Sequence, residues 1–183
     1  MTKPFRLGGY AASTFLGLLG IAFVVVGFVG RADVHDRLAQ EKIVGTPGSS
    51  IAGEEVDTGS EAKTFADTIR SDTLDATGGL TYAEMPRAVF KDTGKAVPEE
   101  RAEQALASGE AINNPERQIW ITSTALSTAL NTSYFAESVA TFAIVVGVAL
   151  VLIGIGLFVL ARGAVGVEAG APALASSGQA QEA

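Results

Sequence analysis

Two long stretches of the chain contain hydrophobic and small residues but no charged ones. They cover residues 7–30 and 138–161, and each is 24 residues long. A helix rises about 1.5 Å per residue, so such a stretch extends about 36 Å and can cross a hydrocarbon core about 30 Å thick with some tilt. Leu, Ile, Val and Phe fill the middle of both stretches. The pattern therefore predicts a transmembrane helix over each of them.

Two other interpretations of these stretches are weaker. Two buried helices of a soluble core would need a large polar shell, which a chain of 183 residues does not offer. The first stretch follows Lys3 and Arg6, as in a signal peptide, but the apolar part of a signal peptide is typically only about 7–15 residues long. Gly27 and Gly30 near its end do not form the Ala-x-Ala pattern of a cleavage site. An uncleaved membrane anchor is the favoured interpretation.

Small residues recur every seven positions in both stretches. They are Ser13, Gly20 and Gly27 in the first and Ala140, Gly147, Gly154 and Ala161 in the second. Because lipid is as apolar as leucine, membrane helices associate through close backbone contact, which small residues permit. A seven-residue spacing is typical of a left-handed crossing, so these are the predicted helix-packing residues of an antiparallel hairpin or of a homo-oligomer. The alternative is that small residues, which are frequent in membrane helices, fall in register by chance. The same register continues to Val34 on the first helix and to Ser133, Leu126 and Ile119 on the second.

The polar segment between the spans, residues 31–137, has a mainly helical pattern. Predicted helices cover Ala32–Val44, Ser60–Thr77, a segment bounded by Pro98 and Gly109, and a segment from near Glu116 into the second span. Residues 45–59 and 86–97 are expected to be irregular, and no stretch of useful length alternates with the period of a strand. The predicted fold class is an all-α membrane protein, in which an antiparallel two-helix transmembrane hairpin carries a mainly helical extracytoplasmic domain between its spans.

Charges near the spans indicate the orientation. Lys3 and Arg6 precede the first span, and loops longer than about 60 residues cross the membrane largely regardless of their charge. Both termini are therefore expected in the cytoplasm, although Arg31, Arg37 and Lys42 just after the first span oppose this. The resulting order is a cytoplasmic N-terminus (1–6), a first transmembrane helix (7–30), an extracytoplasmic loop domain (31–137), a second transmembrane helix (138–161) and a cytoplasmic tail (162–183). The tail is expected to be disordered, because it is rich in Gly, Ala and Ser and has few bulky apolar residues.

Composition excludes several kinds of chemistry. The chain has no cysteine and a single histidine, which excludes disulfides, thiol nucleophiles and cysteine-type zinc sites. A net charge of −7 argues against nucleic acid as a partner. Asp33 and Asp36 flank the histidine, His35, but do not share its helical face, so a solvated side chain is favoured over a metal ligand. An acidic run over residues 54–61 does not have the spacing of an EF-hand calcium loop. We predict no catalytic residue, no cofactor and no metal site.

The stretch Gln118–Tyr134 is rich in hydroxyl groups, with seven Ser and Thr residues. Such residues compete with helical hydrogen bonds, so their density in a helix indicates close packing against a partner. The predicted partner surface consists of Trp120, Thr124, Thr128 and Tyr134. The alternative is that this helix simply packs against residues 32–44 of the same chain.

Several segments resemble a family of small actinobacterial membrane proteins with two spans. They are EKIVGTP (41–47), AGEEVDTGSEAKTFAD (52–67), TLDATGGLTYAEM (73–85) and IWITSTALSTALNTSYFAE (119–137), in this order before a second apolar helix. The resemblance implies a cell-membrane protein without an assigned activity. Automated labels call some members aromatic ring-opening dioxygenases, but a non-haem iron site generally needs two histidines and a carboxylate, and this chain has only His35. No functional residue is carried over from the family.

These patterns lead to one functional expectation. We expect a non-enzymatic accessory subunit or scaffold of the bacterial cell envelope, in contact with the lipid bilayer and with a membrane-protein partner or a second copy of the chain. The alternative is an anchored module that senses or binds a solute outside the cytoplasm.

Overall fold

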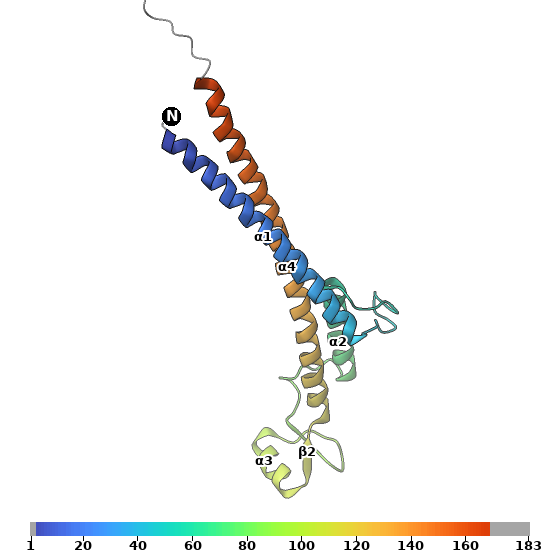
Figure 1. Ribbon diagram of the computed structural model, residues 1–183. Coiled ribbons are helices and arrows are strands. Elements are labelled where there is room, and N and C mark those ends of the chain that lie inside the picture. Colours follow the sequence, from blue (N-terminus) through green and yellow to red (C-terminus); the bar gives the residue numbers. More distant parts are fainter. Residues whose placement is uncertain (1–2, 169–183) are drawn as a thin grey trace, which may run out of the picture. The chain divides into compact units, whose positions relative to one another are not determined.

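The computed structural model describes residues 3–168 and consists mainly of helices (Figure 1). The elements are α1 (Lys3–Glu41), α2 (Gly59–Ala76), β1 (Ala88–Phe90), α3 (Glu99–Ser108), β2 (Ala111–Asn113) and α4 (Pro115–Glu168). These elements form two compact units. The first unit contains α1 before Val29 and α4 after Thr141, and the second unit contains the residues between, Val29–Thr141.

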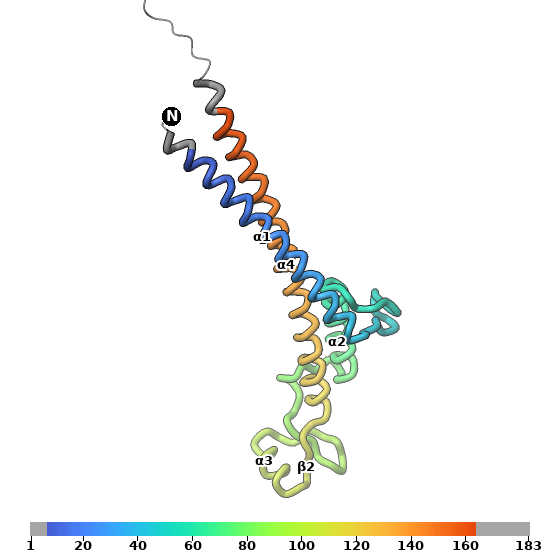
Figure 2. The backbone as a smooth tube through the Cα atoms, in the orientation of Figure 1, coloured from blue at the N-terminus to red at the C-terminus, as the bar shows by residue number. Residues whose placement is uncertain are grey.

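The first unit is a pair of antiparallel helical segments. Gly9 lies opposite Ala161, Ser13 opposite Gly154, and Gly20 opposite Gly147. Residue numbers thus rise along α1 as they fall along α4, and the two segments run side by side in Figure 2. The predicted antiparallel packing of two long apolar helices is confirmed.

The core of the second unit joins α1, α2 and α4. It consists of Val34 and Leu38 from α1, Ala62, Phe65 and Ala66 from α2, Leu130 from α4, and Ile51 and Val56 from the connection between α1 and α2. The helix predicted over Ala32–Val44 is confirmed as far as Glu41, where α1 ends, and it continues the first apolar stretch without a break. Lys42 ends it with a positive φ of 52°. In the connection that follows, Gly45 lies so close to the Ile51 carbonyl that a Cβ atom would overlap it, so only glycine fits there.

A capping box begins α2. The Thr58 hydroxyl accepts a hydrogen bond from the Glu61 backbone N–H, and the Glu61 carboxylate accepts one from the Thr58 backbone N–H. Together these bonds satisfy N–H groups that the first turn of a helix leaves without intrahelical partners. At the other end of the helix, Gly78 and Gly79 adopt positive φ angles, as the sequence predicts for a stop.

A small lobe within the second unit differs from the sequence prediction. β1 pairs with β2 in an antiparallel ladder, with Val89 opposite Ile112, and α3 packs on both strands. The lobe has its own core of Ala88, Val97, Ala102, Ala105 and Ala111. The expectation that residues 86–97 are irregular is wrong for β1, because strands of three residues are too short to give a readable alternation.

The ends of the long helices also extend beyond the predicted spans. α1 already begins at Lys3, and α4 continues to Glu168, so the first residues of the segment expected to be a disordered tail are helical. The rest of that predicted tail, residues 169–183, lies outside the described residues.

Candidate functional site

The contact between the two helices of the first unit is made by backbone atoms. A Cβ atom on Gly20 would lie 2.6 Å from the Gly147 carbonyl oxygen, and one on Gly154 would lie 2.9 Å from the Ser13 carbonyl oxygen. Of the seven predicted helix-packing residues, Ala161 is half-buried and the other six are buried, namely Ser13, Gly20, Gly27, Ala140, Gly147 and Gly154. The Ser13 hydroxyl donates to the Tyr10 carbonyl of its own helix at 2.9 Å, so this buried polar group is satisfied.

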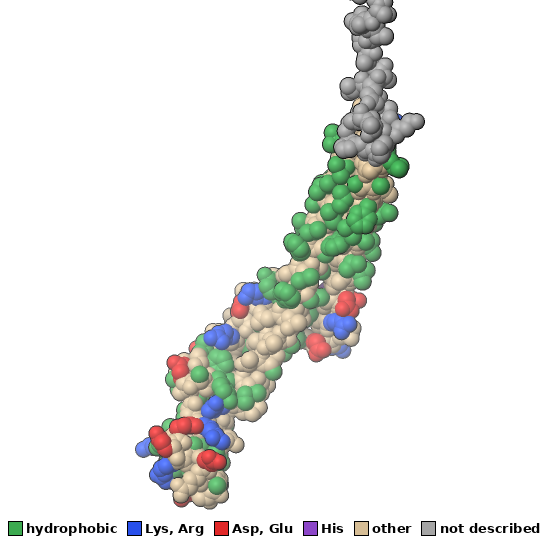
Figure 3. Space-filling model, turned by 90° about the vertical axis from the view of Figure 1, so that its left-hand side faces the viewer, with side chains coloured by type: hydrophobic (Ala, Val, Ile, Leu, Met, Phe, Trp, Pro, Cys, Tyr) green, Lys and Arg blue, Asp and Glu red, His purple; other side chains and the backbone are tan. Residues whose placement is uncertain are grey.

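The outside of the first unit is apolar. Exposed large side chains include Leu7, Phe15, Leu18, Ile21, Val26, Phe142, Val145, Leu152, Ile155 and Leu160. In the most apolar 18-residue stretch of each helix, only 17% is buried in α1 and 11% in α4. On the face shown in Figure 3, hydrophobic side chains are frequent along this unit and no charged side chain is seen among them. Small residues lie inside and large apolar residues outside, which reverses the arrangement of a soluble helical bundle.

An ion pair connects α1 and α4 near the first and last residues of the second unit. The Arg31 guanidinium lies 2.7 Å from the Glu137 carboxylate, and the other carboxylate oxygen accepts a hydrogen bond from the Gly59 backbone N–H, the first residue of α2. Arg31 also donates to the Thr141 hydroxyl at 3.4 Å. Glu137 is only 17% exposed, so one half-buried carboxylate connects three helices.

This ion pair was not predicted from the sequence, although the sequence contains a signal for it. Arg31 is the first charge after one apolar stretch, and Glu137 is the last charge before the other. An antiparallel hairpin brings these two positions to the same level, so their opposite charges could have been matched.

Trp120 lies inside the second unit and not on an exposed surface. Its side chain is 6% exposed, and its indole N–H donates to the Leu80 carbonyl at 3.0 Å and to the Thr77 hydroxyl at 3.2 Å. The Arg70 guanidinium lies over the ring at 5.6 Å from its centre. The indole N–H needs an acceptor when it is buried, and the turn that follows α2 provides two. Trp120 is therefore removed from the predicted partner surface.

The other three residues of the predicted partner surface are exposed. Thr124 and Thr128 face away from the core of the second unit, and Tyr134 is 41% exposed. Several hydroxyl groups of α4 donate to the carbonyl group four residues earlier, among them Thr122, Thr132 and Ser138. These groups are satisfied within the helix, so their density does not by itself require a partner.

The buried face of α4 is displaced from the predicted seven-residue register. Ile119 and Leu126 are exposed, whereas Trp120 and Leu130 are buried. In this part of the chain α4 packs on α2 as well as on α1, as the Ser127 hydroxyl near the Ala66 carbonyl at 3.5 Å illustrates. The prediction that the register continues through these two positions is wrong, because it considered a single helix as the partner.

The His35 side chain contacts Asp57, in the connection that precedes α2. Its Nδ1 atom lies 3.0 Å from the Asp57 carbonyl oxygen and 3.7 Å from the Asp57 carboxylate, and the side chain is 53% exposed. Asp33 instead pairs with Arg37 on its own helix at 2.8 Å. The described residues contain no group of three side chains that could hold a metal ion.

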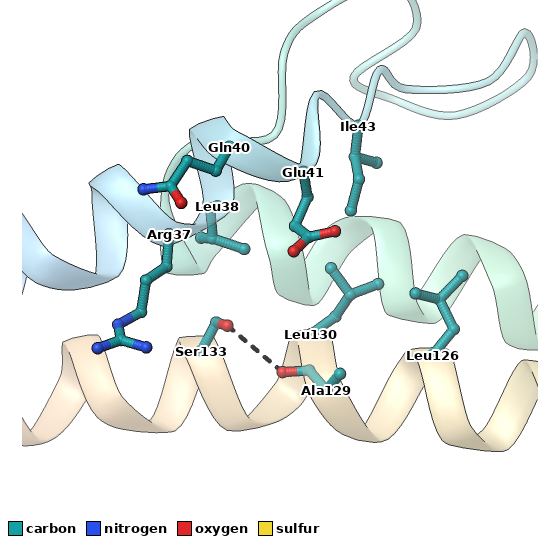
Figure 4. A pocket seen from close by; sticks show the side chains of 9 residues that line it. All are labelled: Arg37, Leu38, Gln40, Glu41, Ile43, Leu126, Ala129, Leu130 and Ser133. Atoms are coloured by element: carbon teal, nitrogen blue, oxygen red, sulfur yellow. Dashed lines mark hydrogen bonds between the residues drawn. The ribbon is translucent and has the colours of Figure 1, made fainter.

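A groove of about 460 Å³ lies between the C-terminal end of α1 and the N-terminal half of α4, and Figure 4 labels the residues that line it. Its polar lining residues are Arg37, Gln40 and Glu41 from α1 and Ser133 from α4. Its apolar lining residues are Leu38, Ile43, Leu126, Ala129 and Leu130. Ser133 donates to Ala129 of its own helix at 3.4 Å. Both charge signs are present in this groove, which therefore does not select a ligand of either sign.

No protein-family model, curated protein or solved structure matches the chain. The structure is that of a mostly helical protein with two helices that are long and apolar enough to span a membrane. The same two helices, α1 and α4, also contribute residues to the second unit. The family resemblance of the sequence remains a prediction.

Proposed function

We propose that this chain is an integral membrane protein of the cell envelope that acts as a non-enzymatic accessory subunit or scaffold. α1 and α4 cross the bilayer, both termini are cytoplasmic, and the second unit lies outside the cytoplasm. The observation that carries the proposal is the arrangement of the first unit, with glycines at the helix contact and large apolar side chains on the outside.

This arrangement favours lipid over water as the surroundings of the first unit. Monomeric soluble proteins rarely expose contiguous apolar patches larger than a few hundred Å². Here the apolar side chains surround both helices over the stretches 7–30 and 138–161, which contain no charged residue. In a bilayer these side chains contact lipid at no cost, and helices provide every backbone hydrogen bond internally. The two helices then associate by the close backbone approach that their glycines permit.

The buried polar groups of the second unit serve the fold, as Trp120 and Glu137 illustrate. The exposed side of α4, with Thr124, Thr128 and Tyr134, offers a hydroxyl-rich helical surface to a partner in the same membrane.

Membrane insertion is tested by alkaline carbonate extraction of membranes that contain the full chain. We expect the chain to stay in the membrane pellet, and its release into the supernatant would contradict the proposal. Orientation is tested with cysteine variants, because the chain contains no cysteine of its own. A membrane-impermeant maleimide should label Thr93→Cys in intact cells, and Ser176→Cys only after lysis.

The accessory role is tested by purification in a mild detergent. We expect one defined membrane protein to accompany the chain, and to be lost when Thr124 and Thr128 are both replaced by Arg. The matched control is Lys95→Glu, an exposed charge change in the small lobe, which should leave the complex intact. Recovery of the native chain as a lone monomer would contradict the accessory role without affecting the membrane assignment.

A further inference from the structure

The second unit contains a hollow with two arginines and no acidic residue. Its volume is about 340 Å³, and it is lined by Tyr82, Arg87, Asn113, Asn114, Pro115, Arg117, Gln118 and Ile121. We propose that this hollow is a binding site for a carboxylate that is attached to a short apolar group. The proposal goes beyond the scaffold function and does not depend on it.

Charge is the first argument for an anionic ligand. Residues 31–137 contain 18 acidic and 10 basic side chains, yet none of the acidic ones lines this hollow. Four other basic residues of the second unit, Arg31, Arg37, Lys63 and Arg101, lie within ion-pair distance of carboxylates. Arg87 and Arg117 form no such pair with any described residue, so both guanidinium groups can bind an incoming anion. A guanidinium group presents paired N–H donors that match the two oxygens of a carboxylate.

Hydrogen bonds of Asn114 connect the segment that carries Arg87 to the start of α4, which carries Arg117. The Asn114 backbone N–H donates to the Arg87 carbonyl at 3.0 Å, and its side-chain amide donates to the Pro86 carbonyl at 3.1 Å. The Asn114 side-chain oxygen accepts from the Glu116 N–H at 3.0 Å, at the start of α4, and Asn114 is buried. One buried asparagine thus fixes the segment that carries Arg87 against the first turn of α4, which carries Arg117.

Tyr82 orients the second arginine and adds an apolar wall. The Arg117 guanidinium lies over the Tyr82 ring at 4.0 Å from its centre, within the range of a cation–π contact. Tyr82 and Ile121 are both exposed and provide apolar surface beside the charges, and the amides of Asn113 and Gln118 add N–H donors. The volume suits a small organic acid or one acidic side chain with its apolar neighbour, and it lies at the lower end of the range for small-molecule sites.

Trp120 provides a reporter for this site. It is the only tryptophan of the chain, lies one turn after Arg117 on α4, and bonds to the Leu80 carbonyl two residues before Tyr82. The full chain in detergent is titrated with 4-methylpentanoate, and its tryptophan fluorescence is recorded. We expect a saturable change with a dissociation constant of about millimolar order, and a response to the uncharged 4-methylpentanamide that is weaker by about tenfold or more.

Variants connect the response to the hollow. Arg87→Gln should weaken binding of the acid by about tenfold or more, and Arg87→Lys should weaken it less, because charge is retained but the paired donors are lost. The matched control is Arg101→Gln, which removes an exposed charge from α3 and should bind as the unchanged chain does. Circular dichroism of each variant verifies that the helices are retained.

Two further probes identify the source of the carboxylate and test the choice of anion. If an acetylated Leu-Asp peptide amide binds more tightly than the free acid, the site accepts the side chain of a protein segment, and tighter binding of the free acid indicates a small organic acid. Inorganic phosphate that binds more tightly than both would overturn the choice of carboxylate. An equal response to acid and amide, or an unchanged response in Arg87→Gln, would overturn the site itself.

Discussion

Gly20 and Gly147 face each other across the first unit, and a Cβ atom on either one would lie 2.6 Å from the carbonyl oxygen of the other. The relationship is symmetric, so neither helix can relieve the overlap by adjusting a flexible side chain. Backbone meets backbone here, and any larger residue must separate the helices.

Gly20→Ala is therefore expected to destabilise the helix pair by about 1–3 kcal/mol, the usual effect of overpacking. The control is Gly156→Ala on α4, where a Cβ atom would have no neighbour within 4 Å and alanine is a better helix former than glycine. Unfolding of both variants in detergent by increasing dodecyl sulfate measures the difference. Equal midpoints for Gly20→Ala and Gly156→Ala would show that this contact does not hold the helices together.

Much of the fold could be predicted because its signals are long. A stretch of 24 uncharged residues, as in 7–30, has few physical interpretations, and a seven-residue spacing of small residues points to one kind of helix contact. The glycines that end α2 and α3, at Gly78 and Gly109, were equally readable, because their positive φ angles favour glycine.

The features that escaped prediction depend on partners far apart in the sequence. β1 and β2 are paired although more than twenty residues separate Ala88 from Asn113, and three residues carry no periodic signal. Trp120 looked like an exposed anchor because nothing nearby in the sequence revealed that the Leu80 carbonyl would accept its N–H. The two arginines of the hollow come from residues 87 and 117, which the pairing of β1 with β2 and the hydrogen bonds of the buried Asn114 bring together.

The pair of Arg31 and Glu137 leads to a second prediction. Glu137→Ala is expected to cost about 1–3 kcal/mol, because it leaves the Gly59 N–H without an acceptor and removes the partner of Arg31. Glu137→Gln should cost less, since its amide oxygen can still accept from Gly59. Thermal unfolding gives the total cost, and hydrogen exchange of the Gly59 amide reports the local effect.

A neighbouring ion pair serves as the control for this prediction. Asp33→Asn removes an exposed pair with Arg37 on the surface of α1, and such pairs contribute only about 0–1 kcal/mol. If Glu137→Ala were no more harmful than Asp33→Asn, the carboxylate would not be joining the three helices.

Trp120 leads to a third prediction, about the join between α2 and α4. Trp120→Phe keeps an aromatic ring but leaves the Leu80 carbonyl and the Thr77 hydroxyl without the indole donor, at an expected cost of about 1–3 kcal/mol. Thr128→Ala on the exposed side of the same helix should change stability by less than about 0.5 kcal/mol. Chemical unfolding of both variants checks the contrast, and the same loss in each would show that the hydrogen bonds of the indole N–H do not stabilise the contact between α2 and α4.

The capping box of α2 predicts a dependence of stability on pH. Burial raises the pKa of the Glu61 carboxyl, but hydrogen bonds from the Thr58 hydroxyl and from the backbone N–H groups of Thr58 and Asp57 lower it by more. The pKa in the folded state therefore lies below that of glutamate in an unfolded chain, which is about 4.3. The stabilisation is complete above the unfolded-state pKa and is lost as the pH falls through the folded-state pKa.

Thr58→Val tests this dependence, because it removes the hydroxyl group and keeps the shape of the side chain. We expect the pKa of Glu61 to rise toward its ordinary value, and α2 to lose about 1 kcal/mol near neutral pH, as is typical for the loss of a helix cap. Thr64→Val is the matched control, since the Thr64 hydroxyl donates to the Ser60 carbonyl and does not contact Glu61. An NMR titration of the Glu61 carboxyl carbon in both variants gives the pKa directly. If the pKa in Thr58→Val equalled that in Thr64→Val, the hydroxyl of Thr58 would not be the group that lowers it, and the backbone N–H groups of Thr58 and Asp57 would be the remaining donors that could.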